Sequence, residues 1–187
     1  MLDAAVLNSA LHVQGWMGKD GLEWLAERAA GKSLVVEVGV WRGRTTTVLS
    51  AVAKRVLAVD TWGGAPGIEA TSVIVDRIGA DGLFSEYCLR FAEKIRDGVV
   101  TPIRIDSSKA AQIMDVYMRG EKADMLFIDG DHDRLYADLE VFSPMVKDGG
   151  LLCGHDYSRK FPAVMRDVEK HVPGFRNGPN AIWWKTV

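Results

Sequence analysis

The sequence predicts an α/β fold in one domain: a Rossmann-like, seven-stranded, mostly parallel sheet with a C-terminal antiparallel hairpin. Two observations support this prediction. Short runs of β-branched and aliphatic residues alternate with amphipathic helical segments, an order typical of βαβ units. The chain then ends with an aromatic strand behind an Asn-Gly-Pro-Asn turn at residues 177–180, which predicts a hairpin. An antiparallel addition of this kind is common in mixed sheets.

The size and composition of the chain limit the classes of function. Its 187 residues suffice for one domain with a sizeable core, and 48% hydrophobic and 26% charged residues are ordinary for a globular protein. A net charge of −2 with interspersed signs predicts neither a nucleic-acid nor a membrane partner. The sequence contains no recognisable signal peptide or apolar run of membrane-spanning length. Cys88 and Cys153 lack metal-type spacing, so we expect free thiols and a cytoplasmic protein.

The first part of the chain, residues 1–32, is expected to form a helical cap on a core made by residues 33–187. The apolar spacing predicts helices over residues 1–11 and 22–30, and Gly31 would end the second. These helices are candidates to cover a pocket mouth or to contact a second subunit, so a homo-oligomer stays open. The first βαβ unit follows as a strand over 33–38, a glycine turn over 39–43, a helix over 44–53 and a strand over 55–60.

The remaining elements continue the same alternation. A loop rich in glycine and proline spans residues 61–67, and a helix is expected around residues 85–95. Residues 101–105 are expected to form a third strand, and Pro102 indicates either that the strand starts there or that it lies at a sheet edge. The later predicted elements are a helix from a cap at Asp106 to Tyr117, a strand over 125–128, a helix over 133–146, a turn over 148–150, a strand over 151–154, a helix over 162–171 and the hairpin over 174–185. Trp16, Met17 and Trp62 lie on predicted loops and are candidates to cover a ligand.

The turn after the first predicted strand reads Glu-Val-Gly-Val-Trp-Arg-Gly over residues 37–43. Its glycines permit a tight turn and the close approach of a ligand, and the following helix N-terminus suits a polar or anionic group. Asp60, about twenty residues on at the end of the second strand, is placed to accept ribose hydroxyls. The Gly39-x-x-x-Gly43 spacing, with the bulky Trp41 inside, disfavours the pyrophosphate of an NAD-type enzyme. These features together favour another nucleoside-type cofactor over an empty βα turn.

At these residues the chain resembles class I S-adenosylmethionine-dependent methyltransferases, over roughly residues 34–185. The resemblance implies that the glycine turn lies against the methionine part of the cofactor. Glu37 would shape this turn and reach the methionine amine through a water. The other implied cofactor contacts are Gly39, Trp41 and Gly43 in the turn, Asp60 and Thr61 at the ribose, Asp106 and Ser107 near the adenine, and Asp129 beyond the next strand.

Acidic and histidine side chains follow two further strands, at residues 129–132 and 155–156. Because the carboxyl ends of parallel strands line the ligand crevice, Asp129, His155 and Asp156 are candidate ligands of a divalent cation, Mg²⁺ or Mn²⁺. Successive side chains of a strand point to opposite faces. Residues 155 and 156 can therefore reach one ion only if the strand has ended at Gly154. Asp131 fits a helix-capping role better.

The stretch from Phe127 to Tyr157 is similar to the metal-dependent O-methyltransferases, both the catechol type and the macrolide-sugar and cephalosporin-hydroxylation-associated type. The resemblance implies metal-assisted O-methylation of a small hydroxylated acceptor, a sugar or a natural product. His132 stands three residues after Asp129, where the catechol type has its lysine base, so the base is either His132 or Asp129. Two alternatives stay open: a metal-independent methyltransferase with His132 as base, and a non-catalytic cofactor-binding module that acts through an oligomer.

Overall fold

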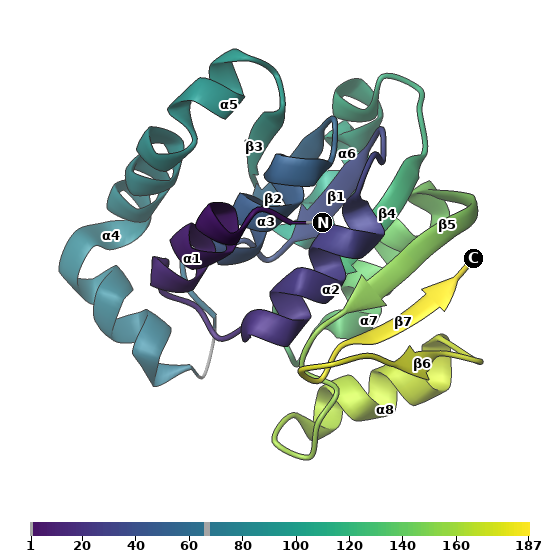
Figure 1. Ribbon diagram of the computed structural model, residues 1–187. Helices are drawn as coiled ribbons and strands as arrows, with labels where there is room; N and C mark the ends of the chain where they lie inside the picture. Colours follow the sequence, from purple (N-terminus) through teal and green to yellow (C-terminus); the bar gives the residue numbers. More distant parts are fainter. Residues whose placement is uncertain (1, 66–67) are drawn as a thin grey trace.

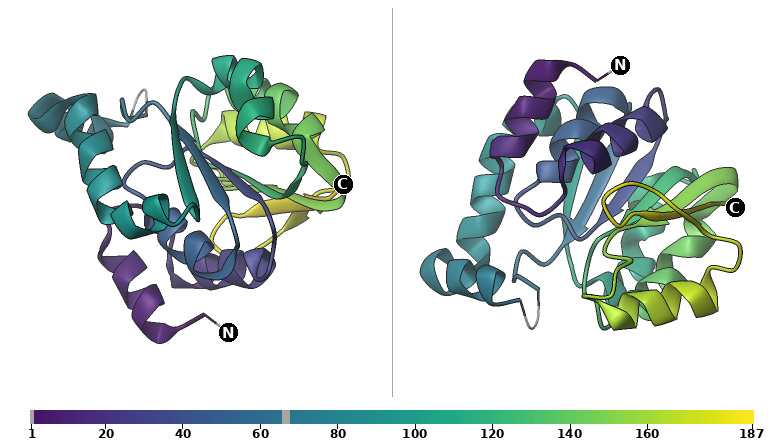
Figure 2. Two further views of the ribbon diagram at one scale, coloured as in Figure 1. Left: turned by 90° about the horizontal axis from the view of Figure 1, so that it is seen from above. Right: turned by 60° about the horizontal axis from the view of Figure 1, so that its bottom comes forward.

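The computed structural model describes residues 2–65 and 68–187, which form a seven-stranded sheet between two layers of helices (Figures 1 and 2). The strand order is β3-β2-β1-β4-β5-β7-β6. The strands are β1 (Val35–Val38), β2 (Val56–Asp60), β3 (Val100–Arg104), β4 (Ala123–Ile128), β5 (Val146–Gly154), β6 (Arg176–Asn177) and β7 (Trp183–Thr186). Strands β1 to β5 pair in parallel, whereas β7 runs antiparallel to β5 and β6. The predicted sheet and its terminal hairpin are therefore confirmed.

The helices lie on both faces of the sheet, as the left panel of Figure 2 shows. One face packs against α1 (Ala4–His12), α2 (Lys19–Ala29), α3 (Arg44–Val52), α4 (Glu69–Arg90) and α5 (Ala92–Arg96). The other face packs against α6 (Ser107–Met118), α7 (Leu135–Phe142) and α8 (Pro162–His171). Because both faces are covered, every residue of β1 and β4 is buried, and this explains why both strands are mostly apolar, with one acidic residue each (Glu37 and Asp124).

Several element boundaries differ from the prediction. The helix expected around residues 85–95 begins at Glu69, is kinked at Gly79 (φ 72°) and continues into α5. The helix expected over 133–146 ends at Phe142, because Pro144 cannot continue it and instead opens a 3₁₀ turn over Ser143–Met145. The turn expected over 148–150 lies inside β5, whose pairing with β4 has an irregularity at this point. Of the predicted helix start and loop, Met1, Pro66 and Gly67 lie outside the described residues.

The connections place a crevice at the carboxyl ends of β1 and β4. Strands β2 and β3 extend the sheet on one side of β1, and β4 and β5 extend it on the other, so the direction in which successive strands are added reverses between β1 and β4, although the two strands are parallel. Ligands of open α/β sheets bind at such a switch point. Cys88 and Cys153 are free thiols, as predicted. None of the helices within the described ranges has the length and apolar character needed to cross a bilayer.

Candidate active site

A cavity of about 290 Å³ opens at the switch point. It collects most of the site residues that the sequence predicts, from the carboxyl ends of five strands. The predicted residues that line it are Gly39, Trp41, Asp60, Thr61, Asp106, Ser107, Asp129, His132, His155 and Asp156. Two predicted residues are not among those that line the cavity: Glu37, which was expected to reach the cofactor through a water, and Gly43.

Gly39 allows the turn after β1 to pass close to the end of β4. Its φ of 83° lies in the left-handed region, and an added Cβ would collide with the carbonyl oxygen of Asp129. The backbone N–H of Asp129 also donates to the carbonyl oxygen of Val38 at 2.7 Å. Gly39 thus lets the glycine turn after β1 lie directly beside Asp129 at the end of β4, and both segments line the same cavity.

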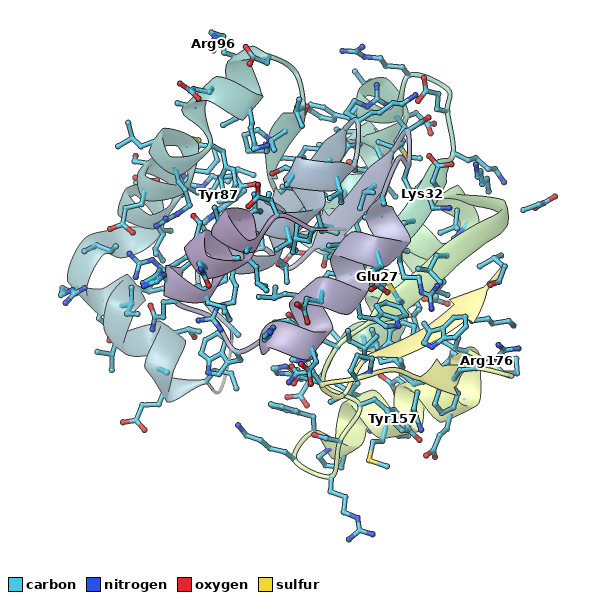
Figure 3. All side chains as sticks on the ribbon, viewed as in Figure 1. Glu27, Lys32, Tyr87, Arg96, Tyr157 and Arg176 are labelled. Atoms are coloured by element: carbon cyan, nitrogen blue, oxygen red, sulfur yellow. The ribbon has the colours of Figure 1, made fainter. Side chains whose placement is uncertain are left out.

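Gly43 has a packing role instead. It has a φ of 87° and precedes α3, and an added Cβ would lie 2.5 Å from the ring of Phe91 and 3.0 Å from that of Tyr87. Figure 3 shows Tyr87 on the inner side of α4. The glycine is therefore needed because α4 and α5 pack tightly against the turn, a contact between segments more than forty residues apart in the sequence.

Glu37 supports the turn from behind the cavity. It is fully buried, and its two carboxyl oxygens accept hydrogen bonds from the hydroxyls of Thr45 and Thr46. Burial raises the pKa of Glu37 to about 8, the two threonine hydrogen bonds offset part of the rise, and the charge of Asp129 adds to it. The carboxyl therefore stays protonated up to neutral pH and joins β1 to the first turn of α3.

Asp60 closes the same turn from the side of β2. Its Oδ2 accepts the backbone N–H groups of Val40 at 2.7 Å and Trp41 at 2.8 Å, and its Oδ1 accepts that of Trp62 at 2.7 Å. A carboxylate has about four acceptor sites, so capacity remains on the oxygens of Asp60 within the cavity. Trp62 itself is buried against Phe84 and Tyr87, so the expectation that it covers a ligand is wrong.

The far end of the cavity lies between α6 and α7. Asp106 caps α6, as predicted, by accepting the backbone N–H of Ser108 at 2.9 Å, and its hydrogen bonds with Ser108 lower the pKa of Asp106. Arg134 lies 3.6 Å from the Asp106 carboxylate. Asp138 also lines this end, although only 2% exposed, and burial raises its pKa to about 6, offset in part by a hydrogen bond with Ser107. Sequence reasoning missed Asp138, although a carboxyl on the inward face of an apolar helix was the available signal.

The acid and histidine residues after β4 and β5 converge. The Nδ1 atom of His155 lies 3.3 Å from Oδ1 of Asp129 and 3.3 Å from Oδ1 of Asp156. The Nε2 atom of His132 lies 2.6 Å from Oδ2 of Asp156. Strand β5 ends at Gly154, and Asp156 has a left-handed φ of 62°. The chain therefore leaves the alternating geometry of a strand, which is the condition for residues 155 and 156 to reach one centre.

The electrostatics of this cluster are dominated by its carboxylates. Burial alone lowers the pKa of His155, but Asp129 and Asp156 outweigh burial and raise it to about 11. The pKa of His132 is also raised, since the hydrogen bond and charge of Asp156 outweigh its burial. Burial raises the pKa of Asp156, but the two histidines outweigh it and hold this pKa far below its usual range. The site thus favours positive charge.

The side chains that converge here could together bind one cation, but the histidine among them is His132 and not the predicted His155. Within the described residues, Asp129, His132 and Asp156 each offer one donor atom, and these atoms lie within 4.8 Å of one another. Two carboxylates and one imidazole are suitable ligands for Mn²⁺, and for Mg²⁺ if waters complete the shell. His155, the nitrogen ligand that the sequence suggested, instead lies between the two carboxylates with a side chain only 6% exposed.

A wall of the cavity comes from the N-terminal cap, through residues 14–17. Arg44 of α3 holds this segment: its guanidinium donates to the carbonyl oxygens of Val13 at 2.7 Å, Met17 at 2.9 Å and Leu11 at 3.3 Å. Trp16 is 53% exposed, and its ring lies 6.2 Å from that of Trp41 across the mouth. Sequence reasoning flagged Trp16 and Met17 but missed Arg44.

The opposite wall comes from the loop after β5. Lys160 and Phe161 line the cavity there. The Phe161 ring stacks on the imidazole of His132, with centroids 4.0 Å apart and planes 18° from parallel. His132 is therefore held by Asp156 at one edge and by Phe161 on one face. No sequence signal marked Phe161, since it simply precedes the proline that begins α8.

Known methyltransferases resemble this chain in sequence and in fold. A family model described as a methyltransferase domain matches residues 36–157. The O-methyltransferase NovP shares 17% identity over 92% of this chain and 82% of its own, with a TM-score of 0.70. A Bacillus cereus O-methyltransferase, solved in complex with SAH, shares 14% over 99% and 92%, with a TM-score of 0.64. The calicheamicin methyltransferase CalS11 shares 15% over 99% and 80%, with a TM-score of 0.62. No curated protein matches by sequence.

The family match covers the glycine turn after β1, the acid that ends β2 and both strand ends that supply carboxylates. The structural neighbours share the fold across nearly the whole chain. The protein therefore belongs to the methyltransferase-domain family and is an S-adenosylmethionine-dependent methyltransferase of the class I fold.

Proposed function

We propose that the protein transfers the methyl group of S-adenosylmethionine to a hydroxyl of a small acceptor, with the assistance of Mg²⁺ or Mn²⁺. The observation that carries the proposal is the convergence of Asp129, His132 and Asp156 at the cavity that contains the Gly39 turn. NovP and the Bacillus cereus neighbour are named O-methyltransferases, and CalS11 is named a TDP-rhamnose 3′-O-methyltransferase. These names support transfer to oxygen, with a sugar or a natural product as the acceptor.

The cofactor would occupy the β1–β2–β3 side of the cavity. The turn from Gly39 to Trp41 would hold the methionine part, Asp60 and Thr61 the ribose, and Asp106 and Ser107 the adenine. The reactive methyl group would then lie toward β4, beside Asp129. The acceptor would then enter between the wall of residues 14–17 and Phe161, so that its hydroxyl reaches the carboxylate cluster.

The chain's own residues would position the two reactants and manage one proton. Bound S-adenosylmethionine supplies the methyl group, and a divalent cation lowers the pKa of the acceptor hydroxyl. Asp129 and Asp156 would hold the cation, with His132 as a third ligand. Asp129 would also take the acceptor proton, because it lines the cavity on the cofactor side and is 25% exposed at its side chain.

A second candidate is supported by one observation, the 2.6 Å contact between His132 and Asp156. A carboxylate that holds one ring nitrogen orients an imidazole and stabilises its protonated form. In this arrangement His132 would take the acceptor proton without a metal, and Asp156 and Phe161 would keep its ring in place. The two candidates share the cofactor and the fold and differ in whether a metal is required.

Two measurements test the proposal. Calorimetry should show binding of S-adenosylhomocysteine and none of NAD; the reverse result would refute the cofactor assignment. Transfer of labelled methyl groups to a panel of nucleotide sugars and hydroxylated natural products should then identify the acceptor class. Activity that disappears after exhaustive EDTA treatment and returns with Mn²⁺ supports the metal. Activity that survives this treatment favours the pair of His132 and Asp156.

A further inference from the structure

The orientation of His155 depends on a residue from the C-terminal hairpin. Asn180 lies in the turn before β7, and its Oδ1 lies 3.3 Å from Nε2 of His155. The other ring nitrogen, Nδ1, lies 3.3 Å from both Asp129 and Asp156. One ring nitrogen thus faces the hairpin, and the other faces the two carboxylates.

The same amide oxygen of Asn180 holds a second segment. It accepts the backbone N–H of Gly18 at 3.0 Å, at the residue that precedes α2. Figure 1 shows the hairpin tip beside the start of α2, in agreement with this contact. Gly18 directly follows the wall of residues 14–17, so one side chain joins the N-terminal cap, the hairpin and the acidic cluster.

The backbone at Asn180 is in an unusual conformation. Asn180 has a φ of 55° and Ala181 a φ of 59°, so two consecutive non-glycine residues are left-handed. Such strain persists only where the surrounding structure enforces it, and it concentrates at functional sites. Here the backbone N–H of Tyr157 donates to the carbonyl oxygen of Ala181 at 3.0 Å. The strained turn is therefore tied to the residue that follows Asp156.

We propose that Asn180 is a positioning residue of the active site, which acts through His155. By holding Nε2, it keeps Nδ1 directed at Asp129 and Asp156 and so fixes the spacing of these carboxylates. Groups that orient a site from outside its inner ligands have this effect in metal centres. The inference rests on the proposed function, because the proposed function assigns cation binding to these two carboxylates. A different role, in which Asn180 only secures the start of α2, would require the contact with Gly18 but not the one with His155.

The test uses the complete chain, with Asn180→Gly as the main variant. Glycine accepts the left-handed φ and removes only the side chain. Asn180→Asp keeps an acceptor oxygen at the same place and serves as the conservative rescue. Asn177→Gly, in the exposed strand β6 of the same hairpin, is the matched control. The chain has four histidines, so their side-chain ¹H–¹⁵N NMR signals can be assigned with single variants.

We expect Asn180→Gly to move the ring ¹⁵N signals of His155 and to speed the exchange of its Nε2 proton. We also expect it to weaken Mn²⁺ binding by about tenfold or more, measured with S-adenosylhomocysteine bound. Asn177→Gly should retain the wild-type His155 signals, and Asn180→Asp, which keeps an acceptor at Nε2, should retain the slow exchange of the Nε2 proton. If Asn180→Gly lowers the melting temperature but leaves the His155 signals unchanged, the inference is refuted and Asn180 only secures α2.

The outcomes separate this inference from the proposed function. If the wild type binds neither S-adenosylhomocysteine nor Mn²⁺, the proposed function fails, whereas the His155 signals still decide the role of Asn180. If Asn180→Gly does not fold, Asn180→Ser replaces it. Its shorter side chain cannot span both contacts, so the His155 signals should again move, and unchanged signals would again refute the inference.

Discussion

The substitution Glu37→Gln tests whether the buried carboxyl behind the cofactor turn is held in its neutral form. Burial raises the pKa of Glu37 from 4.5 to about 8. A carboxyl with a higher pKa in the folded protein stabilises it fully below pH 4.5, and this contribution is lost as the pH rises through 8. The rise from 4.5 to about 8 corresponds to about 5 kcal/mol, at 1.36 kcal/mol per pKa unit. Glutamine cannot ionise, so the variant should not undergo this loss.

The assay is urea denaturation between pH 5 and pH 9, followed by the fluorescence of the six tryptophans. The free energy of unfolding of the wild type should fall relative to that of Glu37→Gln by up to about 1.4 kcal/mol per pH unit below pH 8. Asp115→Asn, at an exposed carboxyl on α6, should follow the wild type. Parallel curves for the wild type and Glu37→Gln would refute the reasoning.

The same variant also tests where Glu37 lies relative to the cofactor. Because Glu37 does not line the cavity, Glu37→Gln at pH 6 should keep its affinity for S-adenosylhomocysteine within about threefold. A much larger loss of affinity would mean that this carboxyl does interact with the cofactor, for example through the water that the family resemblance implied.

Three further substitutions address the cavity itself. Asp129→Asn should abolish methyl transfer yet leave the affinity for S-adenosylhomocysteine within about tenfold, or about 1.4 kcal/mol. If the affinity falls as much as the activity does, Asp129 binds the cofactor instead. Gly39→Ala should lower the free energy of unfolding by about 3 kcal/mol, since its Cβ would collide with the Asp129 carbonyl. Gly31→Ala, where an added Cβ meets no described atom within 4 Å, should cost about 1 kcal/mol, and equal effects in urea denaturation would contradict the steric argument. Asp60→Asn should weaken S-adenosylhomocysteine binding by about tenfold in calorimetry, and unchanged affinity would exclude a ribose contact.

Much of the fold follows from local patterns in the sequence. The segments that form β1 and β4 are nearly continuous apolar runs because both faces of the sheet are covered, and such runs indicate a parallel sheet. A predicted boundary was wrong where two local signals, apolar spacing and a proline, point to different structures. The apolar spacing around Val146 fits a helix, but Pro144 ends that helix and the same residue begins β5.

The candidate site was only partly predictable. Side chains at the ends of parallel strands must share one edge of the sheet, so the neighbourhood of Asp129, His155 and Asp156 could be inferred. Which imidazole joins the carboxylates as a third donor could not, because this depends on side-chain directions after the strands end. His132 points to Asp156, and Phe161 covers one face of its ring.

The sequence by itself determined the class of fold and the residues at the strand ends, because periodicity and glycine turns act over a few residues. Only the tertiary structure decided the roles of residues that function through distant partners. Gly43 serves the packing of α4 and α5, Arg44 holds the N-terminal wall, and Asn180 reaches both His155 and Gly18, from which it is 162 positions away. Such contacts depend on how whole helices and the terminal hairpin pack together, and no local pattern in the sequence encodes that packing.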